Sequence, residues 1–364
     1  MNVDESEAIE FAFEQGWTDG LPVVPPSEQR VTAMLDAAEL ASTHVVGAVS
    51  LNSHTVRAGF VAANAVMAGC KPEYFPIVLA ALEAVLDPAF NIGTVATSTG
   101  GAAVCIIVSG PQASALGMNA SHNLLGPGNR ANATIGRAIH LTVRNALGFD
   151  AGTLSASSIG HPGKYTLCFA EDEGLASWGP LRCELGYAES DTTVTLMGTE
   201  GPRQVANQLN ESPQGVLLSM AAAMKMASTF IVGKGGQGVA ILGYEHALAV
   251  SEAGWTRQQV CEFLAEHTRV NPTELEAGGN RRETGAQHEL ALGEDGKLPT
   301  FQSASDIVLV TAGGPGAGWS SYIPAWAPRI HSRSVTRRVR PVGEALSNCG
   351  PDSCEIPQLI KPMG

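Results

Sequence analysis

The residues best suited to chemistry stand in loops that follow apolar runs. His161 and Lys164 lie three positions apart in the segment HPGKY, and Glu245 and His246 directly follow a β-prone run. An imidazole transfers protons near neutral pH, and an ammonium stabilises developing negative charge. Ligands of α/β proteins bind at the ends of strands. We therefore expect these four residues to be catalytic: either histidine transfers protons, Glu245 orients it or shares its role, and Lys164 stabilises negative charge.

The segment GPGNRAN is the predicted anchor for a ligand. Gly128, Asn129, Arg130 and Asn132 stand where a Gly- and Pro-rich turn runs into a long helix-compatible segment. A helix N-terminus offers unpaired N–H groups and the positive end of the helix dipole. A guanidinium adds a charged donor. We expect this loop to hold a carboxylate or carbonyl group of the substrate.

Two further glycine-rich loops extend the predicted binding site. The segment GKGGQG carries Lys234, and the loop AGGPGAGW runs on to Ser320 and Tyr322. We expect Lys234 to stabilise negative charge and the two hydroxyl groups to bind substrate. The loops lack the spacings GxxxxGK[ST] and GxGxxG, so their pattern does not predict a nucleotide.

No cofactor is the main expectation, and a divalent metal is the alternative. His161 with Glu171 or Asp172, or Glu245 with His246, would supply suitable ligand atoms. The chain contains no HExxH motif and no compact histidine pair, so the spacing does not diagnose a metal site.

One alternative function rests on Cys349 and Cys354 in the segment NCGPDSCE. They are the only close pair among the 7 cysteines of the chain. The spacing would allow a disulfide or a redox pair, which makes a thiol redox protein one alternative function. A non-catalytic protein that binds a small ligand or supports an assembly is the other.

The composition argues against several classes of partner. The net charge is −13 and aromatic residues make up 5% of the chain, whereas nucleic acids bind basic grooves with stacking aromatics. Negative charge also disfavours anionic membranes. The acidic start MNVDESEAIEF does not resemble a signal peptide, and the apolar runs are too short to span a bilayer. We expect a cytoplasmic protein that acts on a small molecule.

The apolar pattern predicts an α/β fold made of two similar halves. We expect helices over residues 4–16, 55–68, 72–87, 130–147, 214–226 and 256–269, and interior strands over 103–108, 239–242 and 306–311. Further β-prone runs precede Gly100 and occupy 230–232. Helix, strand, glycine turn, strand and helix recur in the same order, which we interpret as an internal duplication. The cleft between the two halves is then the expected ligand site.

Two extended arms flank these halves. The predicted segments are an N-terminal helix and Pro-rich arm (1–40), a first half (41–200), a second half (201–323) and an extended C-terminal tail (324–364). Prolines exclude a helix from the segment LPVVPP, and arginines crowd the segment HSRSVTRRVRP. Such arms bind their own body or a second subunit, and we expect a homo-oligomer assembled through them.

Several motifs together resemble a largely uncharacterised bacterial family. They are GWTDGLPVVPP, NAVMAGCKPEYFPIVLAALEA, GPGNRANATIGRA, HPGKYTLCFAEDE and the segment from GYEHA to AGWT. That family is loosely associated with proteins that carry a UGSC selenocysteine motif. This chain has CGPDSC and no CGSC, so the resemblance does not imply thiol or selenol chemistry here. From the residues we expect an enzyme with hydrolase or lyase chemistry on a small polar or anionic molecule.

Overall fold

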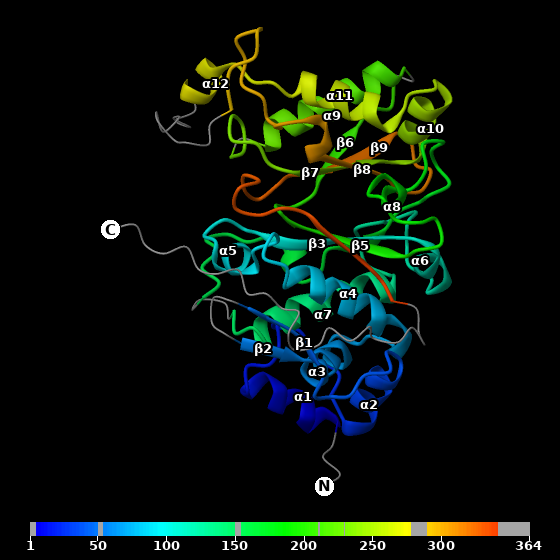
Figure 1. Ribbon diagram of the computed structural model, residues 1–364, viewed down its shortest axis with the longest axis vertical. Coiled ribbons are helices and arrows are strands. Elements are labelled where there is room, and N and C mark those ends of the chain that lie inside the picture. Colours follow the sequence, from blue (N-terminus) through cyan, green and yellow to red (C-terminus); the bar gives the residue numbers. More distant parts are fainter. Residues whose placement is uncertain are drawn as a thin grey trace.

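The computed structural model shows an α/β fold in which two four-stranded sheets lie between layers of helices (Figure 1). It describes residues 5–49, 54–149, 154–209, 212–228, 230–277 and 290–340. Cys349 and Cys354 lie outside these residues, as does the C-terminal tail beyond residue 340. Within the described residues, no helix is long and apolar enough to cross a membrane.

The first sheet has the strand order β10-β5-β3-β4. Strands β3 and β4 are parallel, and β3 with β5 and β5 with β10 are antiparallel. All seven residues of β3, AVCIIVS, are buried, as its apolar run predicts. The elements of this region are α3 (Ala58–Ala68), α4 (Phe75–Val85), α5 (Ile92–Thr97), β3 (Ala103–Ser109), α6 (Pro111–Ala115), α7 (Arg130–Asn145), β4 (Cys168–Ala170), α8 (Leu181–Glu184) and β5 (Thr193–Thr199).

The second sheet has the order β6-β9-β7-β8 and the same set of directions. Here β7 and β8 are parallel, and β7 with β9 and β9 with β6 are antiparallel. The elements of this later part of the chain are β6 (Arg203–Ala206), α9 (Pro213–Ala227), β7 (Gly238–Leu242), α10 (Tyr244–Glu252), α11 (Arg257–His267), α12 (Pro272–Ala277), β8 (Ile307–Thr311), β9 (Trp319–Ile323) and β10 (Val335–Arg338), the last of which joins the first sheet.

The last strand of the described chain returns to the first sheet, because β10 follows β9 along the chain but pairs with β5. β6, the first strand of the second half, pairs with β9 in the second sheet. A helix precedes each central strand, α4 before β3 and α9 before β7, and α7 and α11 follow them. The shared strand order agrees with the repeated sequence pattern, while common descent of the halves stays a prediction.

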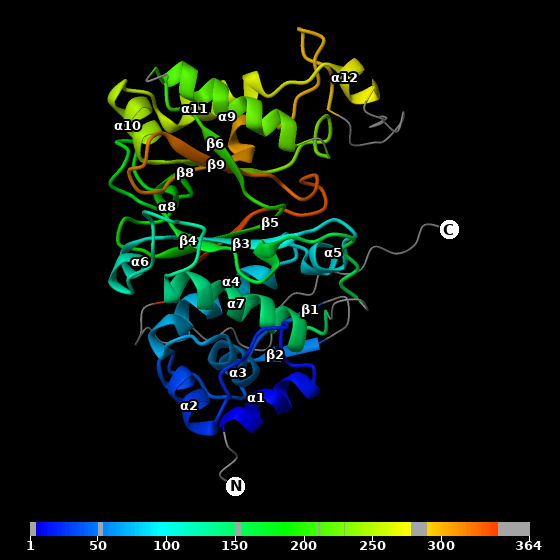
Figure 2. The same cartoon turned by 180° about the vertical axis from the view of Figure 1, so that it is seen from behind.

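Apolar side chains fill the space between the two sheets. The cluster joins residues of both central strands, including Ile107 and Ile241, with Phe169 of β4 and Ile323 of β9. Helices α4 and α7 cover the outer face of the first sheet, and α9 and α11 cover that of the second (Figure 2). Because this interface is formed by buried apolar side chains, removal of their surface from water stabilises the pairing of the halves.

The structure corrects two expected strands. The run before Gly100 forms the short helix α5, because Ile92 and Val95 point together into the core at helical spacing. Residues 230–234 form turns, since Ile231 and Val232 bond back to Ser228. Gly233 has a φ of 73°, which ends extended structure there.

The N-terminal arm packs on its own body. It comprises α1 (Glu5–Glu14), the extended segment 17–26 and α2 (Glu28–Asp36), and the hairpin β1 (Val45–Val49) and β2 (His54–Arg57) follows. Arg137 of α7 holds Asp19 through two hydrogen bonds of 2.8 and 2.7 Å. The backbone of Val24 bonds to Met67 of α3. The extended segment is therefore a strap across α3 and α7.

The C-terminal arm also binds the first half. Residues 335–338 form β10, the edge strand of the first sheet, so the predicted boundary at 324 separates a strand from its sheet. Arg337 pairs with Asp87, and Arg340 lies 3.1 Å from Glu83. Assembly with a second subunit through either arm stays a prediction.

Candidate functional site

A cavity of about 810 Å³ lies beside the first sheet, within the first half. Its apolar wall comes from α5, the start of β3 and the C-terminal part of α7: Ile92, Val95, Ala96, Ala102, Val104 and Val143. The segment 155–165 forms the polar wall, and Asp19 of the strap lies at the side. A cavity of this size and mixed lining suits a small molecule. The expected cleft between the halves is instead occupied by the apolar cluster.

Lys164 carries the most reactive arrangement in this cavity. Its Nζ lies 2.7 Å from the Oγ of Ser157 and 3.3 Å from the Oγ of Ser155. No carboxylate pairs with it among the described residues, and burial lowers its pKa below the ordinary value. A larger fraction of neutral amine results. A neutral amine at hydrogen-bond distance can take a proton from a hydroxyl group.

Ser157 is held in position from its other side. Its Oγ donates to the carbonyl oxygen of Gly100 at 3.0 Å, just before β3. The neighbouring Ser158 donates its backbone N–H to Thr99. The serine loop is thus tied to the start of a buried strand, and this fixes the hydroxyl of Ser157 against Lys164.

His161 positions Lys164 from within the same turn. The ring caps the short 3-10 helix Pro162–Lys164, because its Nδ1 accepts the backbone N–H of Gly163 at 3.1 Å. This bond places the proton of the neutral ring on Nε2, which is buried. Burial lowers the pKa of His161, and the carbonyls of Thr199 and Gly101 oppose this effect. Nε2 has no hydrogen-bond partner among the described residues, whereas the bond of Nδ1 holds the turn that carries Lys164.

His140 of α7 also lines the cavity, and sequence reasoning missed it. Its Nε2 is buried and has no hydrogen-bond partner among the described residues, while the ring makes a hydrogen bond with the backbone of Val104. Burial lowers its pKa to about 4. The only signal in the sequence is a polar residue among apolar neighbours in AIHLTV. This signal does not reveal a cavity whose other walls come from α5, the start of β3 and the segment 155–165.

The predicted anion loop is occupied by its own hydrogen bonds. Asn129 caps α7 by accepting the N–H of Asn132, and its Nδ2 donates to Gly117 at 2.7 Å. Arg130 donates to Gly69 at 3.0 Å, and Asn132 bonds the backbone of Asn119 twice. These side chains fasten the loop to α3 and to segment 117–119. Gly128 has a φ of 122°, which explains why a glycine starts this turn.

Glu245, His246 and Ser320 form a second closed set. The carboxylate of Glu245 accepts three backbone N–H groups of the loop 316–318. Burial raises the pKa of Glu245, but these hydrogen bonds together outweigh that effect and lower it. The buried ring of His246 bonds Ser320 Oγ at 2.6 Å and the carbonyl of Asn207 at 3.0 Å. All three residues thereby fix the loop between β8 and β9.

Tyr322 and Lys234 lie apart from that set and from the cavity. Tyr322 is fully buried and bonds Ser228 at 2.8 Å, and burial raises its pKa. Lys234 is exposed and lies over the ring of Phe230 at 5.0 Å. Of the predicted site residues, the structure therefore brings only His161 and Lys164 together at a cavity.

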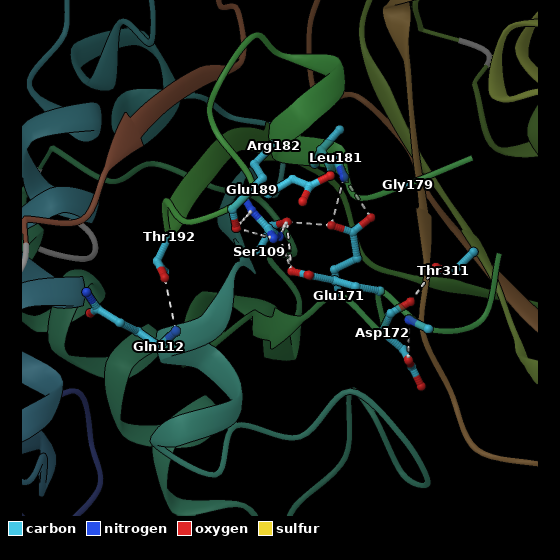
Figure 3. Close-up of polar contacts among 12 residues, drawn as sticks. Ser109, Gln112, Glu171, Asp172, Gly179, Leu181, Arg182, Glu189, Thr192 and Thr311 are labelled. Atoms are coloured by element: carbon cyan, nitrogen blue, oxygen red, sulfur yellow. Dashed lines mark hydrogen bonds and ion pairs between the residues drawn. The ribbon is translucent and has the colours of Figure 1, made fainter. Parts of the chain in front are cut away.

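A buried polar network joins the two halves at the carboxyl ends of β3, β4 and β8 (Figure 3). Ser109 Oγ donates to Glu171 at 2.6 Å, and Leu181 donates its N–H to both carboxylate oxygens at 2.9 Å. Arg257 of α11 lies 3.6 Å from Glu171 and also bonds Leu309 of β8. Burial raises the pKa of Glu171, and these partners oppose the shift.

Glu171 and Asp172, the two acids named above as possible partners of His161 in a metal site, take part in these hydrogen bonds. Glu171 points to Ser109 and Leu181 (Figure 3). Asp172 donates its backbone N–H to the carbonyl of Thr311, and its carbonyl accepts the Thr311 hydroxyl. The part of the chain that the structure describes holds no group of three or more His, Cys, Asp or Glu side chains arranged for a metal ion. The pairs named in the sequence therefore lack further protein ligands of these types among the described residues.

Comparisons with known proteins add little to this site. No protein-family profile matches the chain, and no curated protein matches it. One solved structure that resembles it is the cyanuric acid hydrolase from A. caulinodans, at 13% identity and a TM-score of 0.20. The match covers 66% of this chain and 62% of that structure, so the chain spans less than two thirds of its length. A likeness this low carries no argument about function.

Proposed function

We propose that this protein is an enzyme that hydrolyses a small carbonyl compound in the cavity of the first half. Ser157 is the nucleophile and Lys164 is the general base. The observation that carries the proposal is the 2.7 Å contact between Nζ and Oγ inside a cavity, with no carboxylate partner for Lys164 among the described residues. Serine–lysine pairs are a known variant of the catalytic triad.

The reaction proceeds in two stages that balance. The neutral amine of Lys164 takes the Ser157 proton while Oγ attacks the carbonyl carbon. The bond to the leaving group breaks, and the leaving group takes the proton from the ammonium. Water then attacks the acyl ester, the bond from carbon to Oγ breaks, one proton of the water passes to Oγ, and the acid product leaves.

The lining of the cavity favours a compact substrate. The aliphatic side chains from α5, β3 and α7 suit an apolar body, whereas the hydroxyl and amine groups stand on the opposite wall. Such a wall binds by burial, and the polar groups fix the orientation of one carbonyl group.

Hydrolysis of 4-nitrophenyl acetate, a small activated ester, tests the proposal. We expect Ser157→Ala and Lys164→Met each to lower the rate by about 100-fold or more. Ser155→Ala removes the other hydroxyl group near Lys164 and so distinguishes the roles of the two serines. We expect it to lower the rate less than about tenfold. Lys234→Met controls for loss of a surface lysine and should leave the rate unchanged. A Ser157→Ala protein that keeps its thermal unfolding midpoint and the full rate would refute the proposal.

A second candidate is lyase chemistry through an imine. The lowered pKa of Lys164 favours it, since a neutral amine condenses with a ketone or aldehyde. Incubation with pyruvate and sodium borohydride would then leave a stable adduct on Lys164, and Ser157→Ala would not prevent it. Absence of the adduct, with loss of ester hydrolysis in Ser157→Ala, would select the hydrolase.

The proposed enzyme acts in the cytoplasm. All five described cysteines are unpaired, and four of them are buried. Burial raises the pKa of Cys105 to about 12, which keeps that thiol protonated and inert. Free thiols of this kind support a reducing compartment.

A further inference from the structure

The imidazole of His140 has aliphatic neighbours in the cavity wall, and Arg144 lines the cavity one turn further along α7. Val104 of β3 and Val143 of α7 line the cavity next to the ring. The ring makes a hydrogen bond with the backbone of Val104, which favours protonation, but its buried Nε2 has no hydrogen-bond partner among the described residues. Aliphatic neighbours cannot satisfy this nitrogen.

An unpartnered polar atom in such a wall costs folding free energy. Buried polar atoms without partners are rare in native proteins and call for an explanation. A valine or leucine would pack against Val104 and Val143 without this cost. The ring therefore points to a polar partner that enters the cavity.

We propose that His140 is a further catalytic residue, which activates the water that hydrolyses the acyl-Ser157 intermediate. This inference rests on the proposed function, because it assigns a residue to the second stage of that reaction. Lys164 serves the first stage, in which Ser157 attacks. The two bases then act on different nucleophiles in one cavity.

The charges around the ring keep it neutral. Burial is the largest effect on its pKa, and Lys164 and His161 lower it further when they are protonated, while the hydrogen bond with the backbone of Val104 and the charge of Asp19 raise it. Asp19 is itself held by Arg137, which limits this opposition. At neutral pH the imidazole is therefore unprotonated and can accept a proton from water.

The stage can be written with all protons placed. His140 takes a proton from water while the water oxygen attacks the acyl carbon. The bond from carbon to Oγ breaks, and Oγ regains a proton that comes from the imidazolium. The acid leaves, and His140 and Lys164 are both neutral again.

Burst kinetics with 4-nitrophenyl acetate separate the two stages. In His140→Gln we expect a rapid release of about one nitrophenolate per active site, followed by a steady rate about 100-fold below that of the unaltered protein. Mass spectrometry should show the acetyl group retained on Ser157. In His140→Ala, added imidazole should restore the steady rate, a rescue that a merely structural role would not allow. His267→Gln, a change at an exposed histidine, controls for loss of an imidazole.

Two results would overturn the inference. His140→Gln could keep the full steady rate, or it could slow the burst and the steady rate equally without accumulation of acetyl-Ser157. Failure of the proposed function looks different, because Ser157→Ala would then retain the burst whatever His140 does.

Discussion

At the scale of single residues, the central feature is a lysine without a counter-ion. Burial lowers the pKa of Lys164, and its only described polar contacts are the hydroxyls of Ser155 and Ser157. Desolvation disfavours the ammonium, because its charge is poorly hydrated there. The same effect raises the fraction of Lys164 that is neutral and able to accept a proton near neutral pH.

The pH dependence of hydrolysis follows from this shift. The active form of Lys164 is neutral, so the rate should rise with pH and level off above the lowered pKa, below the value near 10.4 of a free lysine. Initial rates between pH 6 and 10, corrected for spontaneous hydrolysis, measure the midpoint. Lys164→Arg, which stays charged, should be inactive across this range. A rate that falls as pH rises from 7 to 9 would contradict the role of the amine.

The sequence predicted part of this residue set. His161 and Lys164 were recognisable because HPGKY places an imidazole and an ammonium within one turn. Ser157 and His140 were not, because a serine contact seven residues away and a histidine on a distant helix depend on the fold. Asn129 and Glu245 looked like ligand groups, yet Asn129 caps its own helix and Glu245 accepts backbone N–H groups of the loop 316–318.

At the scale of elements, the N-terminal strap completes the cavity. Asp19 lines the cavity, and its carboxylate pairs with Arg137 of α7. The side chains of Asp19 and Arg137 are each about 15% exposed. Partial burial and two parallel hydrogen bonds make this pair stronger than a surface ion pair. The strap therefore connects the order of the arm to the shape of the cavity.

Arg137→Met should loosen the strap. We expect a loss of about 2 kcal/mol in the free energy of unfolding, because the Asp19 carboxylate keeps its burial without its partner. The KM for 4-nitrophenyl acetate should rise more than kcat falls, since the wall and not the base is affected. Urea unfolding and steady-state kinetics measure both effects. Lys71→Met removes an exposed pair with Glu73 and should cost less than about 0.5 kcal/mol. Equal losses in the two variants would contradict a special role for the strap.

Element type was predictable where an apolar run was long. The buried strand β3 and the amphipathic helix α7 appear where their patterns place them. Short runs failed, because α5 satisfies a helical spacing and the turns at 230–234 follow hydrogen bonds to Ser228. Local propensity does not decide such segments, and the surrounding packing does.

At the scale of the whole molecule, the two sheets depend on each other. Strand β10 completes the first sheet, although it follows the strands of the second sheet along the chain. The apolar cluster and the contact of Arg257 with Glu171 add further links. The two sheets share a strand order, while duplication of the two halves stays a prediction. The sequence pattern carried no sign that the last strand returns to the first sheet.

Separate expression of residues 1–200 and 201–364 tests this interdependence. The first fragment lacks β10 and exposes the apolar face of its sheet, so we expect it to aggregate or to lose its near-ultraviolet circular dichroism. Co-expressed fragments should associate and recover the signal of the intact chain. A monomeric 1–200 fragment with a cooperative thermal transition would contradict the account.

The most direct measurement is the site of reaction with a fluorophosphonate, which labels activated serine hydroxyls. Peptide mapping by mass spectrometry should find one adduct per chain, on Ser157, and Lys164→Met should slow its formation by about 100-fold. Ser155→Ala should leave the label in place. Labelling of another serine, or equal labelling of Ser157 without Lys164, would contradict the claim that this pair is the catalytic centre.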